Sequence, residues 1–276
     1  MDINAYYKNT RHHSWISVKN ELDCIGRSYP DMDLAYINFS EQFDIPIGNF
    51  ILTNGCESAL RISLLATKIK YLLLENPTWQ LANIMANAID IKTTNLSYHY
   101  DTRFYIDSPP KEGPVYHTDK FNNLFGHDMI TDYRDLIILD ETYTNGTLFN
   151  SDRIIPENRI VIGSFSKSSS AAMRLGYCIF SNTWYDRFYS LRDRYISREA
   201  CSWLNTPSFV SQPLWNWDIP YNIVSQHPVY TTVIAKTLPI PHKKFTVDGI
   251  DFCRFGNVMN SWKKEYIEWK LNTFFE

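Results

Sequence analysis

The sequence has few of the residues that build disulfide frameworks or zinc sites. Its five cysteines are scattered, odd in number and never spaced as Cys-x-x-Cys. This pattern predicts neither a set of disulfides nor a zinc site, and it favours a reducing, cytoplasmic location. The neighbouring His12 and His13 lack a third ligand at a suitable spacing, so we expect plain surface residues there. No metal site is predicted.

Long apolar runs and a strong charge of one sign are also missing. No run approaches the roughly 20 apolar residues that span a bilayer, and residues 1–15 lack the apolar core of a secretory signal. The formal net charge of the 276 residues is −3. This balance gives no electrostatic footprint for nucleic acid. We therefore expect neither a membrane nor a nucleic acid as partner.

The most informative stretch of the chain is residues 160–177. The apolar run Ile160–Ile162 predicts a buried strand, and Ser164, Ser166 and Lys167 follow it. Arg174 comes seven positions after the lysine. A lysine beside hydroxyls and an arginine suggests an amine aimed at a carbonyl, with an anion held close by. Schiff-base chemistry on pyridoxal phosphate (PLP) requires this arrangement, whereas the alternative is a polar loop with solvated charges.

Two short segments of this stretch resemble a known motif. Ser-Phe-Ser-Lys, ending at Lys167, and Arg-Leu-Gly-Tyr, beginning at Arg174, are similar to the lysine motif of fold-type I PLP enzymes. The nearest branch of this aminotransferase superfamily is the histidinol-phosphate aminotransferase-like one. The resemblance implies that Lys167 forms a Schiff base with PLP and that Ser164, Ser166 and Arg174 bind its phosphate. The family usually places the arginine one residue later, and a one-residue deletion in the turn would explain the difference.

A second signal lies at Leu136–Leu139, an apolar run typical of a parallel strand buried on both faces. Asp140 stands at its C-terminal end, where ligands bind in open α/β sheets. A carboxylate there would keep a pyridine nitrogen protonated, and a protonated ring is an electron sink. The resemblance implies that Tyr143 bonds the 3′-oxygen of the cofactor. A helix cap or metal ligand is the alternative, but the family shows this order, with Lys167 27 residues after Asp140.

Asn54 and Gly55 open an amphipathic helix, whose first backbone N–H groups form an anion site. In the resembled family this is the phosphate cup, which implies contacts from Gly55, Cys56 and Glu57. An ordinary capped helix is the alternative.

Two aromatic residues stand in tripeptides that match the family. The Pro-Thr-Trp segment 77–79 implies that the Trp79 ring stacks on the cofactor pyridine, although a core residue at a helix start would look the same. The Tyr-Pro-Asp segment 29–31 implies a homodimer in which Tyr29 reaches the partner's cofactor phosphate. A turn residue packed beside a proline is its alternative.

The remaining chain departs more from the family. A strand at Phe104–Gly113 is expected to lead into an asparagine-rich loop, but the asparagine that contacts the 3′-oxygen is missing, so that contact is lost or supplied elsewhere. Further on we predict a long helix at Trp184–Arg198, a hairpin at Lys244–Gly256 and a final helix at Met259–Phe275. The resemblance implies that Arg254, on the hairpin, binds the substrate's α-carboxylate through its planar fork. An arginine facing solvent on an edge strand is the alternative.

The sequence thus predicts an α/β protein of PLP-dependent transferase fold type I. We expect a three-layer, mostly parallel sheet with flanking helices, plus a reduced α+β C-terminal domain. The expected parts are an N-terminal arm (1–28), a PLP-binding large domain (29–200) and a small domain (201–276).

The resemblance implies transamination of a small-molecule amino substrate, between an amino acid or amino compound and a keto acid or aldehyde. Lys167, Asp140 and Tyr143 are the expected catalytic residues. A decarboxylase or lyase of the same fold would use the same cofactor residues. A non-catalytic descendant acting as a binding subunit is the third hypothesis, because an asparagine and part of the small domain are missing.

Overall fold

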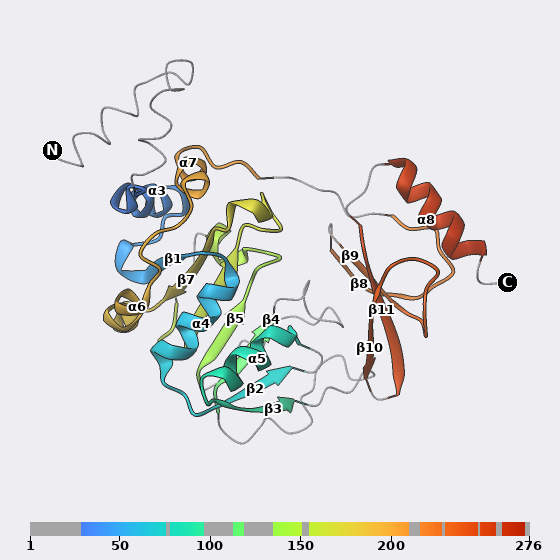
Figure 1. Ribbon diagram of the computed structural model, residues 1–276, viewed down its shortest axis with the longest axis horizontal. Helices are drawn as coiled ribbons and strands as arrows, with labels where there is room; N and C mark the ends of the chain where they lie inside the picture. Colours follow the sequence, from blue (N-terminus) through green and yellow to red (C-terminus); the bar gives the residue numbers. More distant parts are fainter. Residues whose placement is uncertain are drawn as a thin grey trace, which may run out of the picture.

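Two β-sheets organise the chain (Figure 1). The computed structural model describes residues 29–75, 78–96, 113–118, 135–150, 155–209, 216–227, 230–247, 249–257 and 261–273. The predicted N-terminal arm lies outside these residues. Among those described, no helix has the length and apolar character needed to cross a membrane.

The larger sheet has seven strands in the order β1-β7-β6-β5-β4-β2-β3. The strands are β1 (Phe50–Thr53), β2 (Tyr71–Glu75), β3 (Lys92–Leu96), β4 (Val115–Thr118), β5 (Ile137–Asp140), β6 (Arg159–Ser164) and β7 (Gly176–Phe180). Strands β2 to β6 pair in parallel, and β7 runs antiparallel to both of its neighbours. The predicted mostly parallel sheet is confirmed.

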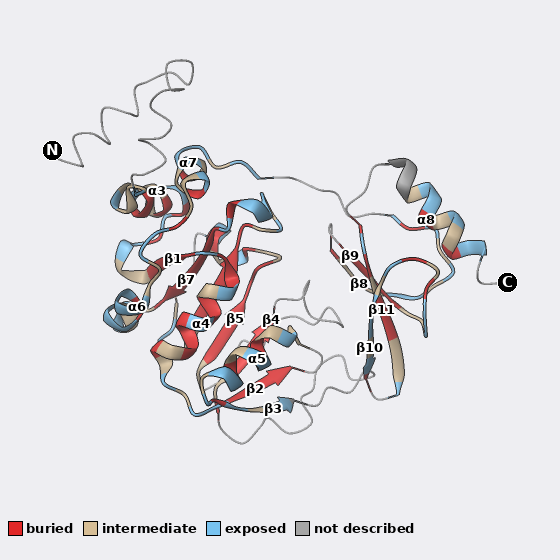
Figure 2. Ribbon diagram, in the orientation of Figure 1, coloured by how far each residue is buried: buried red, intermediate tan, exposed pale blue. Residues whose placement is uncertain are grey.

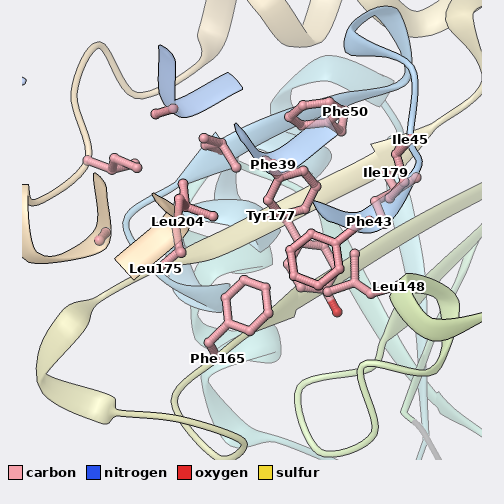
Figure 3. Close-up of a cluster of buried hydrophobic side chains, with 14 of the residues drawn as sticks. Phe39, Phe43, Ile45, Phe50, Leu148, Phe165, Leu175, Tyr177, Ile179 and Leu204 are labelled. Carbon is pink, nitrogen blue, oxygen red and sulfur yellow. The ribbon is translucent and has the colours of Figure 1, made fainter. Parts of the chain in front are cut away.

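Helices cover both faces of this sheet. They are α3 (Met32–Phe43), α4 (Cys56–Thr67), α5 (Gln80–Ala88), α6 (Tyr185–Leu191) and α7 (Arg198–Asn205). Alternate strand residues divide between two apolar clusters, one with α3 and α7 and the other with α4, α5 and α6. Phe39, Phe165 and Tyr177 lie in the first cluster (Figure 3). The central strands β5 and β7 bury both faces and are coloured as buried in Figure 2, whereas the edge strand β3 is mostly exposed.

The smaller sheet is antiparallel, with the order β10-β11-β9-β8. Its strands are β8 (Ile223–His227), β9 (Tyr230–Ile234), β10 (Lys243–Val247) and β11 (Ile250–Gly256), and α8 (Ser261–Thr273) packs on it. Figure 1 shows α8 on the side away from the larger sheet. The predicted hairpin and final helix are therefore confirmed, whereas β8 and β9 were not predicted.

Two sequence-based elements need correction. The long helix at Trp184–Arg198 is wrong, because α6 ends at Leu191 and Arg192 takes an extended conformation. Tertiary contacts favour this break, since the carboxylate of Asp193 accepts hydrogen bonds from the Asn54 N–H and the Ser58 hydroxyl. The strand predicted at Phe104–Gly113 falls almost entirely outside the described residues. The strand between β2 and β5 is β4, which begins at Val115.

Candidate active site

A cavity of about 280 Å³ lies at the C-terminal edge of the parallel strands, the edge where ligands bind in open α/β sheets. Its volume is near the lower end of small-molecule pockets. The lining residues are Cys56, Glu57, Trp79, Asp140, Thr142, Tyr143, Ser164, Ser166, Lys167, Ala171 and Arg174. All the residues predicted to bind a cofactor line this cavity, except Gly55 and Tyr29.

Lys167 lies in the loop after β6, and its ammonium nitrogen is 5.6 Å from the centroid of the Tyr143 ring. The buried side chain of Asn145 holds this loop. Its amide nitrogen donates to the Ser164 carbonyl, at 3.1 Å, and its amide oxygen accepts from the Ser168 hydroxyl, at 2.8 Å. Asn145 therefore ties the turn that carries Tyr143 to the loop that carries Lys167.

Asp140 ends β5 and is only 2% exposed. Each of its carboxylate oxygens accepts a hydrogen bond. Oδ1 accepts from the Thr142 N–H at 2.9 Å, and Oδ2 accepts from the Tyr116 hydroxyl at 2.6 Å. A buried carboxylate with two donors keeps a fixed orientation at the cavity wall.

The start of α4 lies close to the guanidinium of Arg174 at the cavity wall. Gly55 precedes the helix with φ of 88°, and it offers no side chain to cap the first N–H groups. A Cβ at Gly55 would lie 2.9 Å from Arg174 Nη2, and a Cβ at Gly176 would lie 2.5 Å from the Gly55 carbonyl carbon. Because Gly55 and Gly176 have no side chains, β7, the start of α4 and the Arg174 guanidinium can lie in close contact.

The spacing of seven residues between Lys167 and Arg174 still brings Arg174 to the cavity. Arg174 takes a left-handed conformation, with φ of 53°, and its Nη2 donates to the Asn54 carbonyl at 3.4 Å. Cys56 lies beside it at the cavity wall, but burial raises the pKa of the Cys56 thiol well above its usual value. The thiol is therefore not a ready nucleophile.

Two residues of the smaller sheet contact the Tyr143 turn. His227 Nε2 donates to the Tyr143 carbonyl at 3.1 Å, and the Tyr143 ring lies edge-on to the rings of His227 and Tyr230. Burial lowers the pKa of His227 to about 4; the hydrogen bond to Tyr143 opposes this shift, and the charges of Lys167 and Arg254 add to it. The imidazole is therefore neutral at pH 7.

Arg254 does not line the cavity but is connected to it through Tyr230. Its guanidinium carbon is 4.1 Å from the centroid of the Tyr230 ring, and its Nε donates to the Thr232 hydroxyl at 2.9 Å. Burial lowers the pKa of Arg254. The arginine is half-buried against aromatic faces, which does not fit the solvent-facing alternative.

Tyr29 stands apart from the cavity. Its side chain is 67% exposed and stacks on Tyr195, with ring centroids 4.2 Å apart. The partner contact that the sequence implied for Tyr29 stays a prediction.

Comparison with known proteins places the fold. No protein-family model matches the sequence, and no curated protein shows significant similarity to it. Solved structures do match. L-threonine-O-3-phosphate decarboxylase from Porphyromonas gingivalis has 14% identity and a TM-score of 0.71 over 93% of each chain. The histidinol-phosphate aminotransferase from Clostridium acetobutylicum has 13% identity and a TM-score of 0.68 over 94% of each chain.

Tyrosine aminotransferase from Leishmania infantum also matches, with 12% identity and a TM-score of 0.65 over 94% of this chain and 86% of its own. The chain has the fold of these enzymes. The similarity extends over both sheets, and it confirms the fold class that the sequence predicted. At these identities it establishes the fold alone.

Proposed function

We propose that this protein is a PLP-dependent aminotransferase, which transfers an amino group between an amino acid or amino compound and a keto acid or aldehyde. The observation that carries the proposal is the single cavity that Lys167, Asp140 and Arg174 share. Asp140 ends β5, whereas Lys167 and Arg174 both lie in the connection between β6 and β7, so the cavity brings together two separate parts of the chain.

The lining residues fit PLP in chemical type. The uncapped first turn of α4, the hydroxyls of Ser164 and Ser166 and the guanidinium of Arg174 would hold the phosphate. A Cβ at position 55 would collide with the guanidinium of Arg174, so glycine lets this guanidinium lie close to the start of α4. Glu57 at the same wall belongs to the proposed cup.

The remaining contacts concern the ring. The Trp79 ring would stack on the pyridine, Tyr143 would bond the 3′-oxygen, and the Asp140 carboxylate would keep the ring nitrogen protonated. When bound, PLP supplies an electron sink for carbanion chemistry.

The residues of this chain would then perform three tasks. The Lys167 amine would hold the cofactor and, once displaced, move the proton at the substrate's Cα as a general base. Arg254 would bind the α-carboxylate, since its planar donors match two oxygens at once. Tyr230 supports this role by fixing the guanidinium against its ring.

We also propose a homodimer, in which Tyr29 contacts the partner's cofactor phosphate. The exposure of the Tyr29 ring supports a role at a subunit contact. A cytoplasmic location is supported by the free thiols of Cys56, Cys178, Cys201 and Cys253.

A decarboxylase of the same fold is the second candidate. The observation in its favour is the similarity to a threonine-phosphate decarboxylase, at a TM-score of 0.71. Both reactions would use Lys167 and Asp140 alike, so the products separate them. Retention of the lysine, the carboxylate and Arg174 argues against a subunit that only binds.

The test is to incubate the protein with PLP, reduce it with borohydride and locate the trapped adduct by mass spectrometry. We expect the adduct at Lys167, its loss in Lys167→Ala and its retention in the control Lys70→Ala. Trapping at another lysine would refute the proposal. With a panel of amino acids and 2-oxoglutarate, a keto acid product supports transamination, whereas CO₂ release supports the decarboxylase.

A further inference from the structure

Behind Asp140 lies a group of buried polar side chains that no sequence motif names. Tyr116 and Thr118 belong to β4, and Glu75 ends β2. In the sheet register Thr118 lies directly opposite Asp140, and Tyr116 lies opposite Ile138. Both β4 residues could therefore reach Asp140, Thr118 directly and Tyr116 along the diagonal of the sheet.

The hydroxyl of Thr118, the residue directly opposite Asp140, already donates to another acceptor. Thr118 donates both its N–H, at 2.9 Å, and its hydroxyl, at 2.7 Å, to Glu75 Oε2. The other oxygen of Glu75 pairs with His117 Nδ1. Because Glu75 takes both donors of Thr118, the hydroxyl that reaches Asp140 is that of Tyr116, at 2.6 Å.

This bond joins two groups that are almost fully removed from water. Tyr116 is 0% exposed and Asp140 is 2% exposed. Burial, and next the charge of Asp140, raise the pKa of Tyr116 well above its usual value, so the phenol keeps its proton and donates. A charge-assisted O–H···O⁻ bond is among the stronger protein hydrogen bonds, so it restricts the orientation of the accepting carboxylate.

We propose that Tyr116 is a positioning residue, which fixes the carboxylate of Asp140 in the orientation in which it would face the ring nitrogen of a bound pyridine and keep that nitrogen protonated. This role rests on the proposed function, because PLP is the pyridine concerned. Without the Tyr116 hydroxyl the carboxylate would lose its fixed orientation, its contact with the ring nitrogen would weaken, and the ring would lose part of its positive charge.

The test uses PLP labelled with ¹⁵N in the ring, bound to wild-type protein, Tyr116→Phe and Tyr177→Phe. The control is closely matched, since Tyr177 is also fully buried, on β7, and its hydroxyl accepts from Asn145 instead of contacting Asp140. We expect a ring resonance typical of protonated pyridine in the wild type and in Tyr177→Phe. In Tyr116→Phe it should shift toward that of the unprotonated ring.

A second readout needs no cofactor. In the apo-protein, the short bond should give a downfield ¹H resonance that Tyr116→Phe loses and Tyr177→Phe keeps. If Tyr116→Phe does not fold, site-specific 3-fluorotyrosine at 116 keeps the shape and donates more strongly. The downfield proton should then shift, and an unchanged proton would overturn the role.

The possible failures are distinguishable. Tyr116→Phe that binds PLP with the wild-type ring resonance would overturn the role of Tyr116 and leave the proposed function intact. Wild-type protein that binds no PLP would overturn the proposed function, and this role with it.

Discussion

Single residues of the proposed site depend on neighbours that lie far away in the sequence. Asp140 is oriented by Tyr116, Lys167 by the loop that Asn145 holds, and Arg254 by the face of Tyr230. A charged side chain with a fixed partner loses less conformational entropy when it binds a ligand. The site is therefore organised before any ligand arrives.

Arg254→Lys tests the substrate contact. The lysine keeps the charge but loses the planar fork, and it also loses the Nε bond to Thr232. We expect KM for an α-amino acid to rise at least about tenfold, a loss of about 1.4 kcal/mol, with PLP affinity almost unchanged. Steady-state kinetics and a PLP titration check this.

The control for that experiment is Lys243→Ala, because Lys243 is exposed and is the register partner of Arg254 on β10. A KM that stays at the wild-type value in Arg254→Lys would show that Arg254 is structural, or that the substrate carries no α-carboxylate.

At the scale of elements, β7 packs closely against the start of α4 beside the cavity. Gly176→Ala would place a Cβ 2.5 Å from the Gly55 carbonyl carbon, where only backbone movement can relieve the clash. We expect a destabilisation of about 1–3 kcal/mol and weaker PLP binding, because the anion site opens. Urea unfolding and a PLP titration measure the two effects.

Gly48→Ala is the matched control, since nothing lies within 4 Å of a Cβ at that position. It should leave both measurements near wild type. Equal free energies of unfolding for Gly176→Ala and Gly48→Ala would contradict the close packing of β7 against Gly55.

The elements that the sequence predicted are those whose pattern is local. Strands β5 and β6 are apolar on both faces, so a short run of letters reveals them. Strand β4 is different. Its buried Thr118 donates its hydroxyl to the carboxylate of Glu75, which lies 43 residues earlier in the chain. In β9 the Thr231 hydroxyl donates to the Asn257 side chain, and this side chain donates to the His227 carbonyl on β8; no local pattern shows such partners.

The site divides in the same way. Motif order located Lys167, Asp140 and Arg174, which the cavity brings together. It could not locate Tyr116, Asn145 or His227, since each acts through a contact across the fold. The short β-branched and aromatic run after Gly113 and Pro114 was the one signal that pointed to Tyr116.

At the scale of the whole molecule, the two sheets meet at the Tyr143 turn, and His227 there should make stability depend on pH. Its pKa is about 4 in the folded protein against an ordinary 6.5, so the unfolded chain binds more protons between these values. Its contribution to stability is complete above about pH 6.5 and is lost as the pH falls toward 4. Lys167, Arg254, Tyr143 and Tyr230 are the charged and titratable groups around it.

His227→Gln keeps an N–H donor for the Tyr143 carbonyl but does not titrate. When the pH is lowered from 6.5 to 4, the melting temperature of His227→Gln should therefore fall less than that of the wild type. The difference between the two decreases should be at least about 2 °C. Thermal unfolding across this range checks the difference, with His242→Gln as the control at a distance from the turn. Parallel curves for wild type and His227→Gln would contradict a buried neutral imidazole.

The hydrogen bonds of Asn145 have a mechanical consequence. Because one amide binds both the Ser164 carbonyl and the Ser168 hydroxyl, Asn145 couples the turn with Tyr143 to the loop with Lys167. The Tyr143 carbonyl also receives the hydrogen bond from His227 on β8. A displacement of the smaller sheet would therefore act on the Tyr143 turn and, through Asn145, on the loop that carries Lys167.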